Sequence, residues 1–151
     1  MIRDIHHQID IDAPPAAVWA QLTGTAAYRD WNPFVRQLSG ELSEGSRLAV
    51  EIAPPGGRPM TFKPTVQTVD TERELRWLGH LGLPGIFDGE HSFRLEPMAN
   101  GGTRFTQAER FRGVLVRLFG GTIEKTRLGF KEMNQALKQR AEAAVSDKTS
   151  S

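Results

Sequence analysis

The N-terminal part of the sequence alternates between apolar and polar positions. Every second residue from Ile5 to Ile11 shares one face, which is apolar apart from His7, and the residues between them share the other face. A period of two predicts a strand with one buried side. Pro15 suits the first turn of a helix. The pattern therefore predicts a short helix over 16–22 and a second helical piece over 25–30.

The middle of the chain continues with short alternating runs between turn-forming residues. These runs predict strands over 35–39, 46–52, 60–69, 74–80, 90–96 and 103–111. Pro64 falls inside the third run, which predicts a sheet edge or a bulge there, because proline cannot donate to a strand ladder. Asn100-Gly101-Gly102 predicts a hairpin between the last two strands.

In the last third of the chain, apolar residues recur at steps of three, four and seven. This spacing, from Leu115 to Ala141, is typical of one stripe of a long helix. Gly120-Gly121 should interrupt the stripe, which leaves a main helix over 122–145, and residues 146–151 are polar and are expected to form a flexible tail. The order of elements predicts a single α+β domain over 1–145, with an antiparallel sheet whose apolar face is covered by the long helix.

Composition and charge narrow the possible functions. The 151 residues contain 19 Lys and Arg against 18 Asp and Glu, so the net charge of +1 gives no indication of a nucleic-acid or acidic-membrane partner. The absence of cysteine excludes thiol nucleophiles, cysteine-bound metals and disulfides. No apolar run approaches the ~20 residues of a membrane helix, and the first residues lack the pattern of a signal peptide. We therefore expect a cytoplasmic protein.

Three stretches carry a resemblance to a known superfamily. They are Ile11-Asp12-Ala13-Pro14-Pro15-Ala16-Ala17-Val18-Trp19, then Tyr28 with Trp31-Asn32-Pro33-Phe34, and Gly101-Gly102-Thr103-Arg104-Phe105-Thr106 with Glu109 ahead of the helix that holds Met133-Asn134 and Leu137-Lys138. Over about residues 3–145 the sequence resembles the SRPBCC superfamily, the helix-grip fold of START lipid-transfer domains, birch-pollen allergens and polyketide cyclases. The resemblance implies a curved antiparallel sheet of about seven strands wrapped around the long C-terminal helix. It also implies two short helices after the first strand and a cavity between sheet and helix.

Several polar residues stand on strand faces that are otherwise apolar. His7 shares its face with isoleucines, and His91, Gln107 and Glu109 share theirs with phenylalanines. If these faces line the cavity, Glu109 is a buried carboxylate that needs a cation or hydrogen-bond donors, and Arg127 and the histidines are the candidates. The alternative is that Glu109 is solvated near the end of its strand and that His7 caps the edge of the sheet.

The candidate ligand-binding residues combine these polar groups with aromatic residues and with the helix stripe. They are His7, Trp31, Phe34, Phe62, Trp77, His91, Phe93, Phe105, Gln107, Glu109, Arg127, Phe130 and Asn134. No residue is assigned a catalytic role, because the sequence has no Gly-x-Ser-x-Gly motif. No metal is expected, since neighbouring His6 and His7 point to opposite faces, and no cofactor is expected. The glycine-rich segment 79–85 lacks nucleotide-binding spacing and is expected at the mouth of the pocket.

Three functions remain open at this point. The first is the binding of a hydrophobic small molecule, such as a lipid, a polyketide or an aromatic compound, in a cavity of about 300 Å³ or more. The second is a cyclase- or dehydrase-like enzyme in which Glu109 or His91 moves a proton. The third is a protein-interaction module, which needs an exposed apolar patch that the sequence does not reveal. Binding is preferred because no set of residues demands catalysis.

Overall fold

The computed structural model describes residues 1–149, and its element order is that of an α+β helix-grip fold. The strands are β1 (Ile2–Ile11), β2 (Val35–Ser39), β3 (Ala49–Ile52), β4 (Met60–Phe62), β5 (Thr65–Asp70), β6 (Glu74–His80), β7 (Asp88–Pro97) and β8 (Thr103–Arg112). The helices are α1 (Pro15–Thr23), α2 (Tyr28–Trp31) and α3 (Gly120–Thr149), with short 3₁₀ turns η1 (Thr25–Ala27) and η2 (Val116–Phe119).

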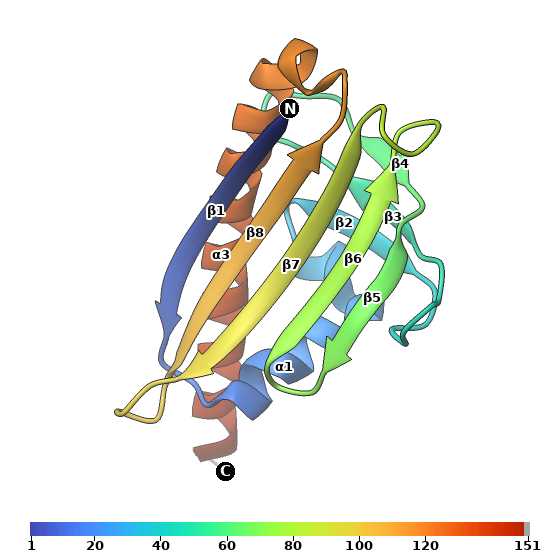
Figure 1. Cartoon of the computed structure of the whole chain (residues 1–151). Helices are drawn as coiled ribbons and strands as arrows, with labels where there is room; N and C mark the ends of the chain where they lie inside the picture. The colour runs from blue at the N-terminus through green and yellow to red at the C-terminus, as the bar shows by residue number, and fades with distance from the viewer. Residues whose placement is uncertain (150–151) are drawn as a thin grey trace.

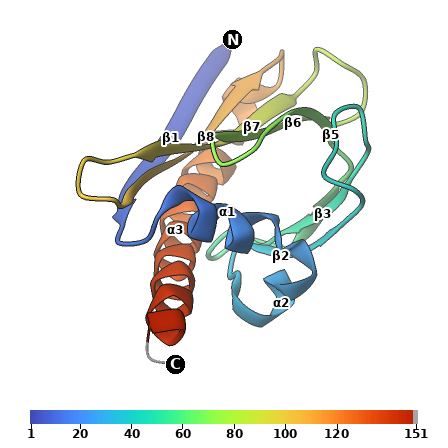
Figure 2. The ribbon, with the colours of Figure 1, turned by 90° about the horizontal axis from the view of Figure 1, so that it is seen from below.

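The strands form a curved surface around the long helix. One antiparallel sheet has the order β1-β8-β7-β6-β5, and a second has the order β2-β3-β4. The backbone joins the two sheets, since the amide of Leu48 donates to the carbonyl oxygen of Pro64 at 2.8 Å. Figure 1 shows α3 behind the larger sheet, and Figure 2 shows from below how the surface continues from β5 round to β3 and β2, with α1 beneath the sheet. The expected grip of a sheet around the C-terminal helix is confirmed.

The sequence pattern explains how α1 and α2 are placed. Pro15 occupies the first turn of α1, where its missing amide hydrogen is not needed, and Val18 and Leu22 point into the core. Tyr28, at the start of α2, is 1 % exposed and its hydroxyl donates to the carbonyl oxygen of Leu22. These contacts fix both short helices against one end of the sheet.

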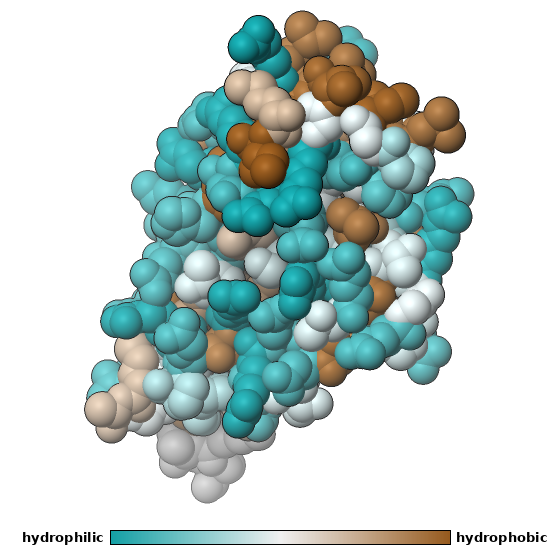
Figure 3. Space-filling view, in the orientation of Figure 1, coloured by the Kyte–Doolittle hydropathy of each residue, from teal (hydrophilic) through white to brown (hydrophobic). Residues whose placement is uncertain are grey.

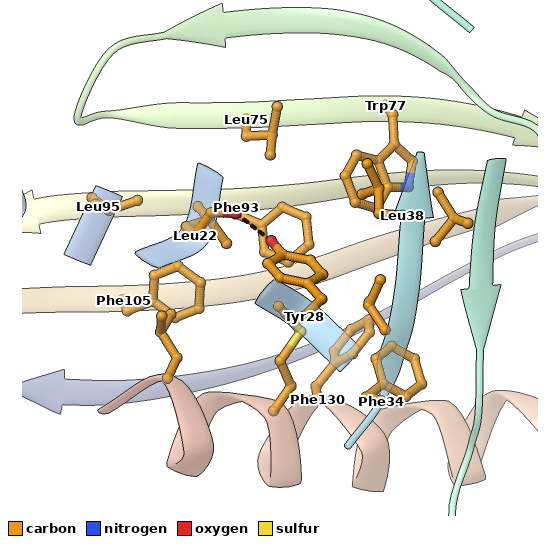
Figure 4. Close-up of a cluster of buried hydrophobic side chains, with 14 of the residues drawn as sticks. Leu22, Tyr28, Phe34, Leu38, Leu75, Trp77, Phe93, Leu95, Phe105 and Phe130 are labelled. Atoms are coloured by element: carbon orange, nitrogen blue, oxygen red, sulfur yellow. Dashed lines mark hydrogen bonds between the residues drawn. The ribbon is translucent and has the colours of Figure 1, made fainter. Parts of the chain in front are cut away.

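The stripe of α3 faces the concave side of the sheet. Its fully buried residues are Ile123, Phe130, Met133, Leu137 and Ala141. Gly129 lies beside this stripe, and a Cβ atom there would overlap the ring of Phe34. The glycine therefore lets this ring pack against the helix, where it meets Phe130 edge-on at 5.6 Å between ring centroids. Figure 4 shows these rings together with Tyr28 and Phe93 in one cluster.

Several expected boundaries differ from the structure. The run 60–69 is two strands in different sheets, because Pro64 interrupts the ladder and the chain crosses from β4 to β5. The helix begins at Gly120 without a break at the glycine pair, and it continues past the expected end at Val145 as far as Thr149. Of the expected tail 146–151, the last two residues lie outside the described part of the chain. Within residues 1–149 no helix is long and apolar enough to cross a membrane.

Candidate ligand-binding cavity

A cavity of about 160 Å³ lies where the two sheets meet the N-terminal part of α3. Its apolar wall comes from both sheets, the β6–β7 loop, η2 and α3, and consists of Phe34, Val50, Ile52, Pro54, Met60, Phe62, Pro64, Trp77, Leu81, Phe87, Phe111, Phe119 and Ile123. Glycines at 79 and 89 and the polar residues His80, His91, Glu109, Thr122 and Thr126 complete it. Met60 and Leu81 are 41 % and 45 % exposed, so this side of the wall reaches the surface.

The cavity is smaller than the 300 Å³ expected from the sequence, and that expectation is wrong. Aromatic residues fill the rest of the space between sheet and helix: Tyr28, Phe34, Phe93, Phe105 and Phe130 are all fully buried (Figure 4). The end near the start of α3 stays open. An apolar cavity of about 150 Å³ accommodates one benzene ring, so the enclosed part of this cavity suits a body of about that size.

The Glu109 carboxyl projects from β8 into this apolar wall. Its side chain is 15 % exposed, and within the described residues it accepts no hydrogen bond. It lies over Gly89 of the neighbouring strand, where an added Cβ would overlap Glu109 Oε2. Among residues 1–147, no lysine or arginine lines the cavity. Burial without a cation raises the pKa of Glu109 to about 8, so the carboxyl is mostly protonated at neutral pH.

His91 of β7 lies directly beside Glu109. Its Nδ1 atom is 3.6 Å from Glu109 Oε1, and its Nε2 atom is 2.9 Å from Gln107 Oε1. Aromatic rings surround the imidazole: the ring centroid of Phe93 lies at 4.5 Å and that of Phe130 at 5.0 Å. Burial lowers the pKa of His91 to about 4, so the imidazole is neutral at physiological pH.

A chain of hydrogen bonds leads from His91 away from the cavity. Gln107 Nε2 donates to Asn134 Oδ1 at 2.8 Å, and Asn134 Nδ2 lies 2.9 Å from His7 Nδ1 and 3.0 Å from the His7 carbonyl oxygen. Gln107 and Asn134 are fully buried. We call these four residues, His91, Gln107, Asn134 and His7, the polar chain. It links β7, β8, α3 and β1 through the core, and burial together with nearby Lys131 and Arg127 lowers the pKa of His7.

The comparisons with known proteins agree with this architecture. The profile of the family described as "Polyketide cyclase / dehydrase and lipid transport" matches residues 3–142. The chain belongs to this family. Among curated proteins, none matches the sequence significantly.

Solved structures share the fold at low sequence identity. Norcoclaurine synthase from Thalictrum flavum, solved as a point mutant with a transition-state analogue, has a TM-score of 0.72 and 17 % identity over 93 % of this chain and 94 % of its own. A protein from Thermus thermophilus has a TM-score of 0.73 and 18 % identity, covering 94 % of this chain and 99 % of its own. Ara h 8.0201 has a TM-score of 0.64 and 14 % identity, covering 95 % and 99 %. At these identities the likeness shows the fold alone.

In this member of the polyketide cyclase / dehydrase and lipid transport family, the residues expected at a site fall into separate groups. Those that line the cavity are Phe34, Phe62, Trp77, His91 and Glu109. Three aromatic residues, Phe93, Phe105 and Phe130, belong to the solid core, where each is 0 % exposed. Trp31 is half-buried and packs edge-on against Tyr28, with ring centroids 5.3 Å apart. His7, Gln107 and Asn134 form the polar chain behind the cavity.

Arg127 does not pair with Glu109, and that expectation is wrong. Its Nε donates to Glu124 Oε2 at 3.1 Å on the exposed face of α3. The residue before it, Thr126, lines the cavity. One residue turns a helix by about 100°, so a neighbour in sequence points to a different side. Of the suggested partners, His91 lies beside the carboxyl, but at 3.6 Å the two atoms are too far apart for a hydrogen bond.

Several lining residues were not anticipated. Gly89 could have been identified, because a glycine inside a strand often marks a close approach of another group. Phe87, Phe119 and Thr122 come from a loop, a 3₁₀ turn and the start of α3. The way that such segments fold over a cavity leaves no periodic signal in the sequence.

Within the described residues, no cluster of three or more histidine or acidic side chains could hold a metal ion.

Exposed apolar side chains also gather at this end of the molecule. Leu83, in the β6–β7 loop, is 71 % exposed, and Val114 and Leu118, after β8, are 78 % and 76 % exposed. The two segments are adjacent, since the Val114 amide donates to the carbonyl oxygen of Gly85 at 3.2 Å. Figure 3 shows brown side chains clustered at the upper end of the molecule. Periodicity could not reveal this grouping, because the two segments are far apart along the chain.

Proposed function

We propose that this chain binds a small, largely apolar molecule in the cavity at the start of α3. The observation that carries the proposal is an apolar, mostly aromatic wall with two convergent polar groups, Glu109 and His91, set into it. Sites for small molecules typically combine an apolar lining with a few placed polar groups. Membership of a family described by cyclase and lipid-transport functions supports this proposal. The cavity volume of about 160 Å³ favours an aromatic or otherwise compact body over a long, fully enclosed lipid chain.

A second candidate function is a cyclase- or dehydrase-like reaction in the same cavity. It is favoured by one observation: an acid with a pKa of about 8 lies next to a neutral imidazole. Groups that titrate near the working pH are suited to giving and taking protons. Unchanged turnover of a bound compound in Glu109→Gln would remove this carboxyl from the reaction.

Native mass spectrometry of the purified protein, before and after organic extraction, tests the binding proposal. We expect an adduct that extraction removes. If the ligand is lost during purification, a thermal-shift screen with small aromatic compounds is the test instead, because a compound that binds the folded state raises the melting temperature.

A pair of matched variants ties any signal to the cavity. Ile52→Phe adds bulk to a lining residue, and Ile9→Phe makes the same change at a half-buried position of β1 outside the cavity. We expect Ile52→Phe to weaken the adduct or the thermal shift and Ile9→Phe to leave either unchanged. Equal effects of the two variants would place the ligand elsewhere and contradict the proposal.

A further inference from the structure

One backbone carbonyl fixes the orientation of every group in the polar chain. The His7 carbonyl oxygen can only accept, so the group 3.0 Å from it must be the amide NH₂ of Asn134. The Asn134 oxygen then faces Gln107, which must present its own NH₂ at 2.8 Å. The Gln107 oxygen is left to face His91 Nε2 at 2.9 Å. His91 therefore carries its hydrogen on Nε2.

This assignment leaves His91 Nδ1 as a hydrogen-bond acceptor beside Glu109. The 3.6 Å between Nδ1 and Oε1 is longer than a hydrogen bond. An ionised carboxylate would set two acceptors against each other inside an apolar wall. A protonated carboxyl instead provides a donor beside an acceptor, and the pKa of about 8 that burial gives Glu109 agrees with this state. Within the described residues, neither Nδ1 nor the carboxyl has a hydrogen-bond partner.

We propose that Glu109 and His91 together recognise a hydroxyl group, so that the ligand is an uncharged alcohol or phenol with a compact apolar body. A hydroxyl oxygen accepts from the Glu109 acid while its hydrogen is donated to His91 Nδ1. The inference rests on the proposed function, since it names the class of molecule that the cavity takes.

Other polar groups on a ligand match the Glu109–His91 pair less well. A carboxylate ligand would find one acid donor and no lysine or arginine in the described cavity wall. An ammonium ligand would find no carboxylate to pair with while Glu109 keeps its proton. A ketone would accept from Glu109 but leave His91 Nδ1 without a donor. The other histidine of the wall, His80, is held at the rim by Asp88, with Nδ1 2.7 Å from Oδ1, and the Thr126 hydroxyl already donates to the Thr122 carbonyl oxygen at 2.9 Å.

Four one-ring probes test the inference: benzyl alcohol, toluene, benzoate and benzylammonium. Their dissociation constants are measured at pH 6.5 by NMR titration of the protein. We expect benzyl alcohol to bind roughly 3- to 10-fold more tightly than toluene, which is the range for neutral hydrogen bonds, and both to bind more tightly than the two ions. Tighter binding of benzoate or benzylammonium, or no preference for the alcohol over toluene, would overturn the inference.

Variants of Glu109 assign the preference to this carboxyl. Glu109→Met should lose the preference for the alcohol over toluene, whereas Glu109→Gln, which keeps a donor at the same place, should retain the preference. Glu132→Met makes the same change at an exposed position of α3 and should alter neither toluene binding nor the preference for the alcohol. An alcohol preference that survives in Glu109→Met would overturn the inference. If that variant does not fold, the wild-type ranking and Glu109→Gln decide.

The outcomes also separate this inference from the proposed function. Toluene binding without any alcohol preference removes the inference and leaves the binding function in place. Failure of all four probes to bind removes the inference, and the absence of both an extractable adduct and a thermal shift removes the proposed function as well.

Discussion

Replacing Glu109 with glutamine should change how the stability of the protein depends on pH. The pKa of Glu109 is raised from an ordinary 4.5 to about 8 by burial. Below pH 4.5 the carboxyl is protonated in both the folded and the unfolded state, so it causes no penalty. Between these two pH values the unfolded state ionises and the folded state does not, so the wild type loses stability as the pH rises. Above about pH 8 both states are ionised and the loss is complete.

The size of the effect follows from the same two values. The interval from 4.5 to about 8 spans roughly 3.5 decades of proton concentration, each worth about 1.4 kcal/mol, so the full penalty is about 5 kcal/mol. Water that enters the open side of the cavity reduces it, and we take this figure as an upper bound. Glu109→Gln stays neutral at every pH and should escape the penalty.

The assay is urea unfolding of wild type and variant at several values between pH 5 and pH 9. The difference in free energy of unfolding, variant minus wild type, should rise by up to about 1.4 kcal/mol per pH unit and level off above pH 8. Taking the difference cancels the titration of all other groups. Glu132→Gln, at an exposed position of α3, is the control and should give a flat difference. A flat or falling difference for Glu109→Gln would refute the argument that this carboxyl is buried without a partner.

Four further substitutions test the packing of the cavity wall and of the core behind it. Gly89→Ala should destabilise the protein by about 1–3 kcal/mol in urea unfolding, because the added Cβ would overlap the Glu109 carboxyl; a neutral result would mean that the carboxyl can swing aside. Gly129→Ala should also lower the free energy of unfolding, since its Cβ would overlap a core phenyl ring. Gly121→Ala in the same helix is the control: its Cβ would have open space around it, and the free energy of unfolding should rise by about 0.5–1 kcal/mol. Equal changes in the two variants would contradict the close contact at Gly129. Asn134→Leu should lower the free energy of unfolding by about 1–3 kcal/mol, because it leaves buried polar groups without partners. It should also shift the ¹⁵N resonances of the His91 ring. Unchanged resonances would show that the polar chain does not set the tautomer of His91.

Most of the strands and the long helix could be predicted because each carries its own periodic signal. The bounds of β2 and β6 coincide with the runs of alternation at 35–39 and 74–80. Alternation also placed His91, Gln107 and Glu109 on inward faces, where they are buried or half-buried. The strand over 60–69 was predicted whole because alternation continues on both sides of Pro64, and alternation does not report which sheet a residue joins.

The cavity itself could not be predicted from such patterns. Its volume depends on how far the aromatic core extends toward the start of α3, which is a matter of packing between segments far apart in sequence. Charge alone makes Arg127 a candidate partner for Glu109 alongside the histidines, and the rotation of α3 that directs Arg127 to Glu124 rules it out. Alternation was enough to predict that the carboxyl is buried, but it holds no information on whether a cation lies beside it.

The buried polar groups of this core are hydrogen-bonded along the polar chain but lack hydrogen bonds where the chain meets the cavity. From the His7 carbonyl oxygen to His91 Nε2, each step of the polar chain is a hydrogen bond of 2.8–3.0 Å. The pairing ends at the face of the cavity, where His91 Nδ1 and the Glu109 carboxyl stand 3.6 Å apart. An apolar residue at position 109 would avoid the loss of stability that builds up between pH 4.5 and about pH 8. The rule that buried polar groups have hydrogen-bond partners is most often broken at functional sites. Here it is broken at the end of the polar chain that faces the cavity, where a ligand hydroxyl would supply the missing hydrogen bonds.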